Sequence, residues 1–472
     1  MKKYPQSALS CLLAGLIVVL PSAVRADETG VEAVPPYGPV VDESADLLKV
    51  PAGLSGRDGF VVAKQPPRIT FSTFTGLPTL RDTKKKGGLW SLWGEGVRAA
   101  NGKFYVGVGN HRGRDANCYL YEYDPATHAH RQVVDVARLI GQKDGEWGQG
   151  KLHGRLDEMP DGWIYFATYW GEHPDRLPLD EQLKIGGRLV RYNTRTGETE
   201  DLGAPYPGES WPMHATDTAR GIFHAIGLWG GYLAYDVFTG KKIFCGQLPG
   251  DITWDGRDTL IDEKTGFCYG SEMHTRRLVG FDPARAAFFH TKASVPRHPV
   301  AGKESRPWIR SYTRRRLRDG SFICQTYDGV MFKFFPDEER TELMGTNWGD
   351  GLYATSMALS PDDHYLYYTV GAHGSTWNAG SPIIQLDLRT NAKKVLAFLH
   401  PYYQEKHGYV FGGSYSVCAD SKATGLLITW NGRFRKSDET GESFGHLSFM
   451  HLAIPAAERT DPPAGQARTV AK

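Results

Sequence analysis

Residues 235–240 read YDVFTG, and the pattern that they set decides the fold. An aromatic or apolar strand end, followed by Asp or Asn and a Thr-Gly-like turn, is typical of a tight connection between two strands. Five more copies follow one another at steps of 43 to 69 residues, which fits propeller blades with loop insertions. The copies are 123–127 (YDPAT), 192–197 (YNTRTG), 281–284 (FDPA), 335–337 (FPD) and 386–390 (LDLRT).

Each repeat also contains an alternating aromatic strand before this turn, such as 163–167 (WIYFA) or 365–369 (YLYYT). The pattern predicts an all-β protein, a seven-bladed β-propeller over residues 89–455. The expected units span roughly 90–130, 150–200, 211–243, 253–290, 308–340, 353–393 and 412–454. Residues 27–88 are expected to be an extended N-terminal segment that lends one strand, 68–72, and residues 456–472 a loose tail.

The composition excludes a disordered chain and a coiled coil. The 472 residues carry 55 Lys+Arg against 53 Asp+Glu, a formal charge of only +2, so bulk charge gives no sign of a polyanion partner. The 55 Gly and 23 Tyr indicate many short strands and turns. The basic run 312–318 (YTRRRLR) alternates within an expected strand, so we interpret it as a solvated or substrate-steering face and predict no nucleic-acid partner.

The first residues resemble an export signal. Lys2 and Lys3 precede an apolar run over 8–20, and VRA at 24–26 suits a cleavage site. The run is too short to span a bilayer comfortably. The sequence therefore predicts a signal peptide over 1–26 and a secreted or periplasmic protein without membrane insertion, expected to be a monomer.

Candidate functional residues lie where propellers place ligand sites, at one end of the central channel. Many of the 16 histidines fall at the starts of blades or at the ends of second strands. Histidines grouped with Tyr and Arg, without a nucleophilic Ser elbow or a carboxylate pair, suit removal of a proton beside a carboxylate. A His or Tyr takes the proton while Arg or His stabilises the charge that develops.

At these residues the chain resembles the secreted seven-bladed β-propeller polysaccharide lyases, of the ulvan lyase type and more distantly the oligogalacturonate lyases. The resemblance covers roughly residues 90–454 and rests on the blades and on segments 108–111 (VGNH) and 150–155 (GKLHGR). It implies β-elimination next to a uronate in an anionic polysaccharide or oligosaccharide. His111 and His153 would then share the base and carboxylate-neutralising roles.

The remaining catalytic roles are less uniquely placed. Tyr169 is the predicted catalytic tyrosine, although Tyr269 and Tyr327 compete with it, and Arg277 is the predicted arginine. Tryptophans could stack on sugar rings, and further polar residues at equivalent positions could bind substrate. The predicted substrate-binding residues are Arg112, Trp170, His214, Tyr327, His373, Trp430 and Arg433.

A metal site is a further hypothesis. His214, His224, Cys268 and His274 fall on neighbouring blades, and zinc accepts such ligands in a tetrahedral set. The alternative interpretation is a core cysteine and surface histidines. No other cofactor is predicted.

Two other functions remain open at this stage. One is a non-catalytic propeller that binds glycans or proteins. The other is a metal-dependent propeller lactonase or hydrolase, which needs carboxylates at the mouth of the channel and finds only Glu158, Asp217 and Asp255.

Overall fold

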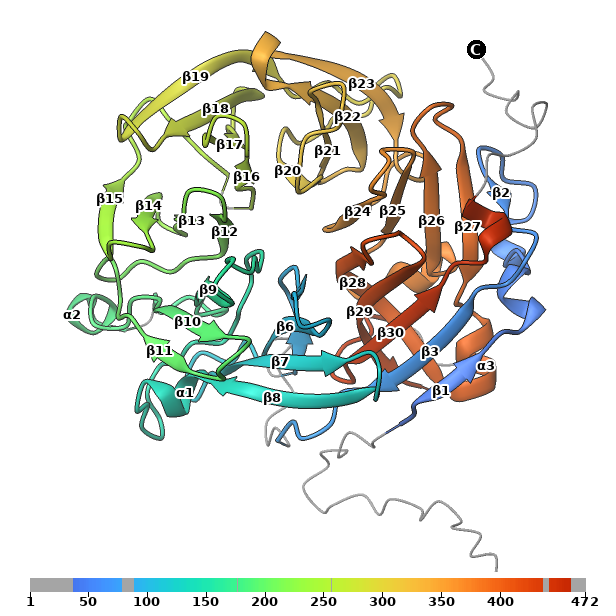
Figure 1. Ribbon diagram of the computed structural model, residues 1–472, viewed down its shortest axis with the longest axis horizontal. Coiled ribbons are helices and arrows are strands. Elements are labelled where there is room, and N and C mark those ends of the chain that lie inside the picture. The colour runs from blue at the N-terminus through green and yellow to red at the C-terminus, as the bar shows by residue number, and fades with distance from the viewer. Residues whose placement is uncertain (1–36, 79–88, 176, 256, 436–440, 460–472) are drawn as a thin grey trace, which may run out of the picture.

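The computed structural model describes residues 37–78, 89–175, 177–255, 257–435 and 441–459. Seven sheets stand as blades in a ring (Figure 1), which confirms the predicted seven-bladed β-propeller. The predicted signal peptide, 1–26, lies outside the described residues. Within those residues, no helix is long and apolar enough to cross a membrane.

The first strand of a complete blade lies nearest the axis of the ring and later strands lie further out (Figure 1). Blade 1 holds β4 (Ser91–Leu92), β5 (Val97–Arg98), β6 (Phe104–Gly109), β7 (Cys118–Asp124) and β8 (Ala129–Asp135); blade 2 holds β9 (Trp163–Ala167), β10 (Leu189–Asn193) and β11 (Thr199–Asp201); blade 3 holds β12 (Met213–Asp217), β13 (Ile222–Ile226), β14 (Gly231–Asp236) and β15 (Lys241–Gln247).

The ring continues in the same order. Blade 4 holds β16 (Leu260–Ile261), β17 (Cys268–Ser271), β18 (Arg277–Asp282) and β19 (Ala287–Ser294); blade 5 holds β20 (Ile309–Tyr312), β21 (Phe322–Thr326), β22 (Val330–Phe335) and β23 (Arg340–Thr346). Blade 6 holds β24 (Met357–Leu359), β25 (Tyr365–Thr369), β26 (Pro382–Asp387) and β27 (Lys393–Phe398), and blade 7 holds β28 (Tyr409–Ala419), β29 (Gly425–Phe434) and β30 (Ser448–Ala453).

Helices are short and lie in the connections. The α-helices are α1 (Val136–Leu139), α2 (Leu179–Gln182) and α3 (Tyr402–His407). The 3-10 turns are η1 (Ala45–Leu48), η2 (Ala52–Leu54), η4 (Pro336–Glu338), η5 (Thr376–Ala379) and η6 (Ala456–Arg459).

The repeated Asp or Asn has a direct structural role in the turns. Oδ1 of Asp236 accepts hydrogen bonds from the backbone N–H groups of Phe238 and Thr239, at 2.9 and 3.0 Å, and so shapes the turn between β14 and β15. Equivalent bonds form in four other copies. The copy at 335–337 differs, because η4 begins at Pro336 and the carboxylate of Asp337 contacts Lys264 and Arg316.

The N-terminal segment completes two blades. Strand β3 (Arg68–Thr73) pairs with β30 on the outside of blade 7, and β1 (Val40–Asp42) pairs with β3. Strand β2 (Val61–Val62) runs parallel to β27 in blade 6. The segment therefore contributes more than the single strand expected from the sequence, and its strands belong to the sheets of the ring.

Residues 456–459 differ from the predicted loose tail. They form η6, in which Glu458 is buried. The carboxylate of Glu458 accepts the backbone N–H groups of Lys64 and Gln65, and it lies 3.0 Å from Nζ of Lys394. This end of the chain is thus held between the N-terminal segment and blade 6, while the rest of the predicted tail, 460–472, lies outside the described residues.

Candidate functional site

A cavity of about 290 Å³ opens where the first strands of the blades begin. Ligand sites commonly occupy about 300–1,000 Å³, so this one suits a small group such as one sugar unit. A larger cavity of about 620 Å³ lies beside α3, but its lining mixes lysines with carboxylates. The smaller cavity is lined by Trp93, Lys151, His153, Asp255, Arg257, Arg306, Trp308, Arg310, Tyr327, Tyr353, His373 and Tyr415. We call these twelve residues the cavity layer.

The innermost chains of blades 1, 2 and 4 to 7 supply most of this lining by alternation, and Tyr327 and His373 follow the second strands β21 and β25. Residues two apart in an extended chain point the same way, so a single strand presents side chains to the axis at successive depths. In blade 2, where 150–158 replaces a regular first strand, Lys151 and His153 line the cavity. Arg155 and Asp157 follow at the same spacing and form an ion pair with each other.

A second set of charged residues follows the cavity layer along the same chains. Glu95 comes two residues after Trp93, and Arg314 comes four after Arg310. We call Glu95, Arg155, Asp157 and Arg314 the ionic layer.

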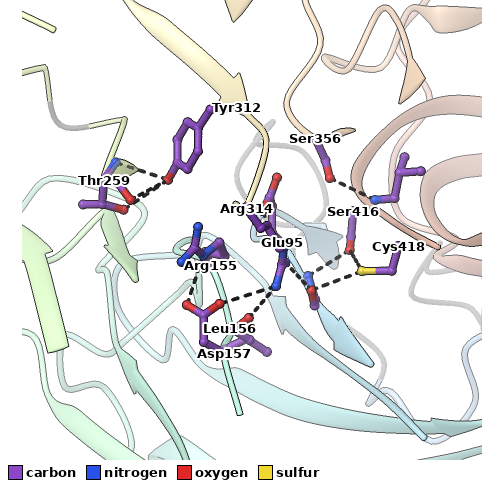
Figure 2. Close-up of polar contacts among 12 residues, drawn as sticks. Glu95, Arg155, Leu156, Asp157, Thr259, Tyr312, Arg314, Ser356, Ser416 and Cys418 are labelled. Carbon is purple, nitrogen blue, oxygen red and sulfur yellow. Dashed lines mark hydrogen bonds and ion pairs between the residues drawn. The ribbon is translucent and has the colours of Figure 1, made fainter. Parts of the chain in front are cut away.

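The ionic layer is balanced in charge (Figure 2). Nε of Arg155 lies 3.0 Å from Oδ2 of Asp157, and these side chains are only 4% and 11% exposed. Arg314 contacts Oδ1 of Asp157 at 3.5 Å and Oε2 of Glu95 at 3.3 Å. Two guanidinium groups therefore face two carboxylates, and the set links blades 1, 2 and 5.

The cavity layer is unbalanced, because Lys151, Arg257, Arg306 and Arg310 face the single carboxylate of Asp255. Nζ of Lys151 lies 4.0 Å from the ring centroid of Trp93 and 5.2 Å from that of Tyr169. Burial, reinforced by Arg257 and Arg310, holds the pKa of Lys151 well below its usual value. Within the described residues, Lys151, Arg257 and Arg310 have no carboxylate at ion-pair distance, so the cavity is prepared to receive an anion.

His153 is held in its neutral form. Nη1 of Arg257 lies 2.8 Å from Nε2 of His153, and because a guanidinium can only donate, Nε2 accepts. Burial, followed by the charges of Arg257 and Lys151, holds the pKa of His153 well below its usual value. The positive charge of this pair therefore stays on Arg257.

Tyr415 and His373 are neighbours in the lining, and the ring centroid of Tyr415 lies 6.3 Å from that of His153. The hydroxyl of Tyr415 lies 3.4 Å from Nε2 of His373, and its ring centroid lies 5.3 Å from that of Trp93. Burial raises the pKa of Tyr415 well above 10, although Arg310 and Arg257 act in the opposite direction. The Tyr415 phenol is therefore protonated at neutral pH.

Three of the residues predicted from the sequence line the cavity, namely His153, Tyr327 and His373. Tyr169 and His111 lie just behind the lining: the ring of Tyr169 is 6.0 Å from that of His153, and the ring of His111 is 5.7 Å from that of Trp93. Burial, followed by the charge of Lys151, lowers the pKa of His111 to about 3. The predicted pair of His111 and His153 is thus gathered at one end of the ring, but only His153 is in the lining.

Other predicted residues lie outside the lining. Arg277 begins β18 with an exposed side chain, and Arg433 is exposed near the end of β29. Trp170 and Trp430 are fully buried between strands, so their rings are not free to stack on a sugar. Arg112 follows His111 in the loop after β6 and is half-buried outside the lining.

The four predicted zinc ligands are not brought together. His214 lies opposite Ala225 in the β12–β13 pair and His224 lies opposite Ala215, so the two imidazoles point to opposite faces of blade 3. His214 instead stacks on Phe223, and Nδ1 of His224 lies 2.9 Å from the hydroxyl of Tyr232. Cys268 is buried and His274 is exposed in the β17–β18 turn. Among the described residues, no three His, Cys, Asp or Glu side chains are placed to hold a metal.

The carboxylates considered for a lactonase are also dispersed. Glu158 accepts hydrogen bonds from the Ala100 N–H and the Thr194 hydroxyl, and Asp217 pairs with Arg220. Only Asp255 lines the cavity.

Most of the cavity layer is not predicted from the sequence, because the predicted site residues were chosen at strand ends and among the histidines. The missed residues that carry the charge, Lys151, Arg257 and Arg310, lie on the innermost chains. The signal that could have found them is the two-residue alternation of polar side chains there, as in Lys151, His153, Arg155 and Asp157. The missed residues are Trp93, Lys151, Asp255 as part of this lining, Arg257, Arg306, Trp308, Arg310, Tyr353 and Tyr415.

No family model matches the chain. Among solved structures it is similar to U3-55K, with 8% identity and a TM-score of 0.46 over 80% of this chain and 98% of that one. It is also similar to the WD40 repeats of RRP9, with 8% identity and a TM-score of 0.47 over 84% of this chain and all of that one. These likenesses concern the fold only.

Proposed function

We propose that the protein binds a uronate of an anionic polysaccharide or oligosaccharide in the cavity layer and cleaves the adjoining bond by β-elimination. The observation that carries the proposal is the gathering of Lys151, Arg257 and Arg310 around one small cavity, without carboxylate partners. The resemblance to propeller lyases, given by the blades and segments 108–111 and 150–155, supports it. The predicted export signal agrees with a substrate outside the cytoplasm.

The proposed chemistry starts from the uronate carboxylate. Arg257 and Arg310 bind it and stabilise the charge that moves onto it when the neighbouring C5 proton leaves. The oxygen of Tyr415 takes this proton as the phenol passes its own proton to Nε2 of His373. His153 orients Arg257 through the bond at 2.8 Å. In this assignment the base is Tyr415, in place of the Tyr169 predicted from the sequence.

The test is the ultraviolet absorbance of the unsaturated product, measured with ulvan, pectate and glycosaminoglycans. Tyr415→Phe should lower the rate about 10²–10⁴-fold and leave affinity for the saccharide within about twofold. Arg310→Met should weaken that affinity about 10- to 100-fold, because a charged hydrogen bond is lost. Arg277→Met is the matched control, since that exposed arginine lies outside the cavity, and it should change neither quantity.

The proposal fails if wild-type protein forms no unsaturated product from any of these polymers, or if Arg277→Met reduces activity as much as Arg310→Met.

A second function is favoured by the protonated state of Tyr415. Because its pKa is raised well above 10, the Tyr415 phenol stays protonated at neutral pH and supplies no phenolate base on its own, which suits a propeller that binds an anionic glycan without cleaving it. That function predicts saturable saccharide binding by calorimetry, weakened by Arg310→Met and indifferent to Tyr415→Phe, with no unsaturated product.

A further inference from the structure

Asp255 is the single carboxylate of the cavity layer, and its surroundings set it apart from the other buried acids. Its side chain is buried, and Oδ2 makes no hydrogen bond with any described residue. Although it lines the same cavity as Arg257 and Arg310, it forms no ion pair with either within the described structure. Asp157 in the ionic layer, by contrast, contacts two arginines.

The neighbouring Asp258 shows what a structural carboxylate looks like in this blade. Its Oδ2 accepts the N–H and the hydroxyl of Ser271, at 2.9 and 2.5 Å, and its Oδ1 accepts the indole N–H of Trp254 at 3.0 Å. Asp258 is therefore fully occupied in holding β17. Among the described residues, Asp255 is anchored through its backbone N–H, 2.9 Å from the Ser271 carbonyl, and not through its side chain, so its carboxyl group is left for a ligand.

The burial of Asp255 favours its neutral form at mildly acidic pH. Burial raises the pKa of Asp255 to about 6, although Arg310 of blade 5 and Arg257 of its own segment lower it. Burial, reinforced by the negative charge of Asp255, also raises the pKa of Asp258 well above its usual value. A neutral carboxyl group that lines a cavity can donate a proton to a bound ligand.

β-Elimination needs such a donor. When the bond between C4 and the glycosidic oxygen breaks, the oxygen would leave as a strongly basic alkoxide unless a proton reaches it. Arginine is too weak an acid for this step. Resting on the function proposed above, we propose that Asp255 is the general acid, which donates its carboxyl proton to the leaving glycosidic oxygen.

The complete step balances. Tyr415 takes the C5 proton while its own proton moves to His373, and the C5–H electron pair becomes the C4=C5 double bond. The C4–O bond breaks, its electron pair stays on the oxygen, and that oxygen takes the Asp255 proton. Asp255 ends as a carboxylate and His373 as an imidazolium, and exchange of one proton with water at each resets the site.

Asp255→Asn tests this role with two substrates that differ in the leaving group. On the polymer, kcat/KM should fall about 10²–10⁴-fold. Wild-type activity should decrease as pH rises above about 6, and the variant should lack this decrease. On a synthetic uronide that carries a nitrophenoxy group at C4, the variant should remain within about tenfold of wild type, because nitrophenolate leaves without a proton. Asp251→Asn, at an exposed position just before this segment, is the control and should match wild type on both.

The outcomes separate the two proposals. Equal losses on the two substrates, or an unchanged pH profile, would overturn the role of Asp255 while wild-type activity still supports the lyase. Wild-type protein that forms no unsaturated product from either substrate would overturn both.

Discussion

The cavity layer and the ionic layer are built on the same chains and treat charge in opposite ways. In the ionic layer Arg155 and Arg314 each contact a carboxylate at 3.0 to 3.5 Å. In the cavity layer, four residues earlier on the same chains, Lys151 and Arg310 contact aromatic rings and have no carboxylate partner among the described residues. The paired charges of the ionic layer link the blades, whereas the unpaired charges of the cavity layer are available to bind an anion.

This difference indicates that the ionic layer serves stability and that the cavity layer, on the same chains, serves binding. A buried charge without a partner destabilises the folded state, and the penalty is relieved when an anion binds. The unpaired cations of the cavity layer therefore lower the free energy of unfolding of the free protein and strengthen the binding of an anion. The ionic layer supports the chains that carry it, so substitutions in the two layers should have opposite effects on unfolding.

The largest effect is expected from Arg155→Met. The change leaves the buried carboxylate of Asp157 with the longer contact to Arg314 and one hydrogen bond from the Thr216 N–H, but without its close cationic partner. Removing one partner of a buried pair costs about 3–5 kcal/mol. The free energy of unfolding in urea should fall by that amount. Arg277→Met serves as the exposed control and should stay within about 0.5 kcal/mol of wild type. A loss below 1 kcal/mol for Arg155→Met would mean that the ionic layer does not hold the ring together.

The same comparison explains what the sequence could predict. The fold is predictable because Asp or Asn recurs at one turn of six blades, and in five of them this residue forms the turn through local hydrogen bonds such as those of Asp236. Hydrogen bonds between residues two or three positions apart can be predicted from a single sequence. The blades then follow from the repeat, because neighbouring sheets must bury each other's apolar faces.

The site is harder to predict from the sequence, because its residues come together only when the ring of blades closes. Lys151 and Arg310 are far apart in sequence, and nothing local distinguishes them from the arginines of 312–318. The alternation of that run predicts a solvated or substrate-steering face, yet Arg315 and Arg316 pair with Asp363 and Asp262. Charge pairing across blades thus decided which arginines are structural, and a linear pattern does not contain that information.

A smaller effect of opposite sign is expected from Lys151→Met. Folding buries this amine without a carboxylate, so an apolar side chain of similar length should raise the free energy of unfolding by about 2 kcal/mol at neutral pH. The pKa of Lys151 is lower in the folded state than in the unfolded chain. Wild-type stability therefore increases as pH rises toward the ordinary lysine value, and the advantage of the variant should shrink between pH 7 and pH 10.

Urea unfolding at several pH values checks this sign. Affinity for the anionic saccharide should fall in the same variant. Destabilisation at pH 7 would show that Lys151 is satisfied in the folded protein and that the two layers do not differ as described.

The smallest effect is expected from Ser416→Ala, at the edge of the ionic layer. The Ser416 hydroxyl accepts the backbone N–H of Gly96 at 2.9 Å, next to Glu95, and losing this acceptor should cost about 1 kcal/mol of unfolding free energy. Because the bond lies below the cavity layer, saccharide affinity and product formation should stay within about twofold of wild type. A larger change in saccharide affinity or product formation, with a loss of only about 1 kcal/mol in stability, would show that the ionic layer also positions the cavity residues. The assignment of stability to the ionic layer and of binding to the cavity layer would then be wrong.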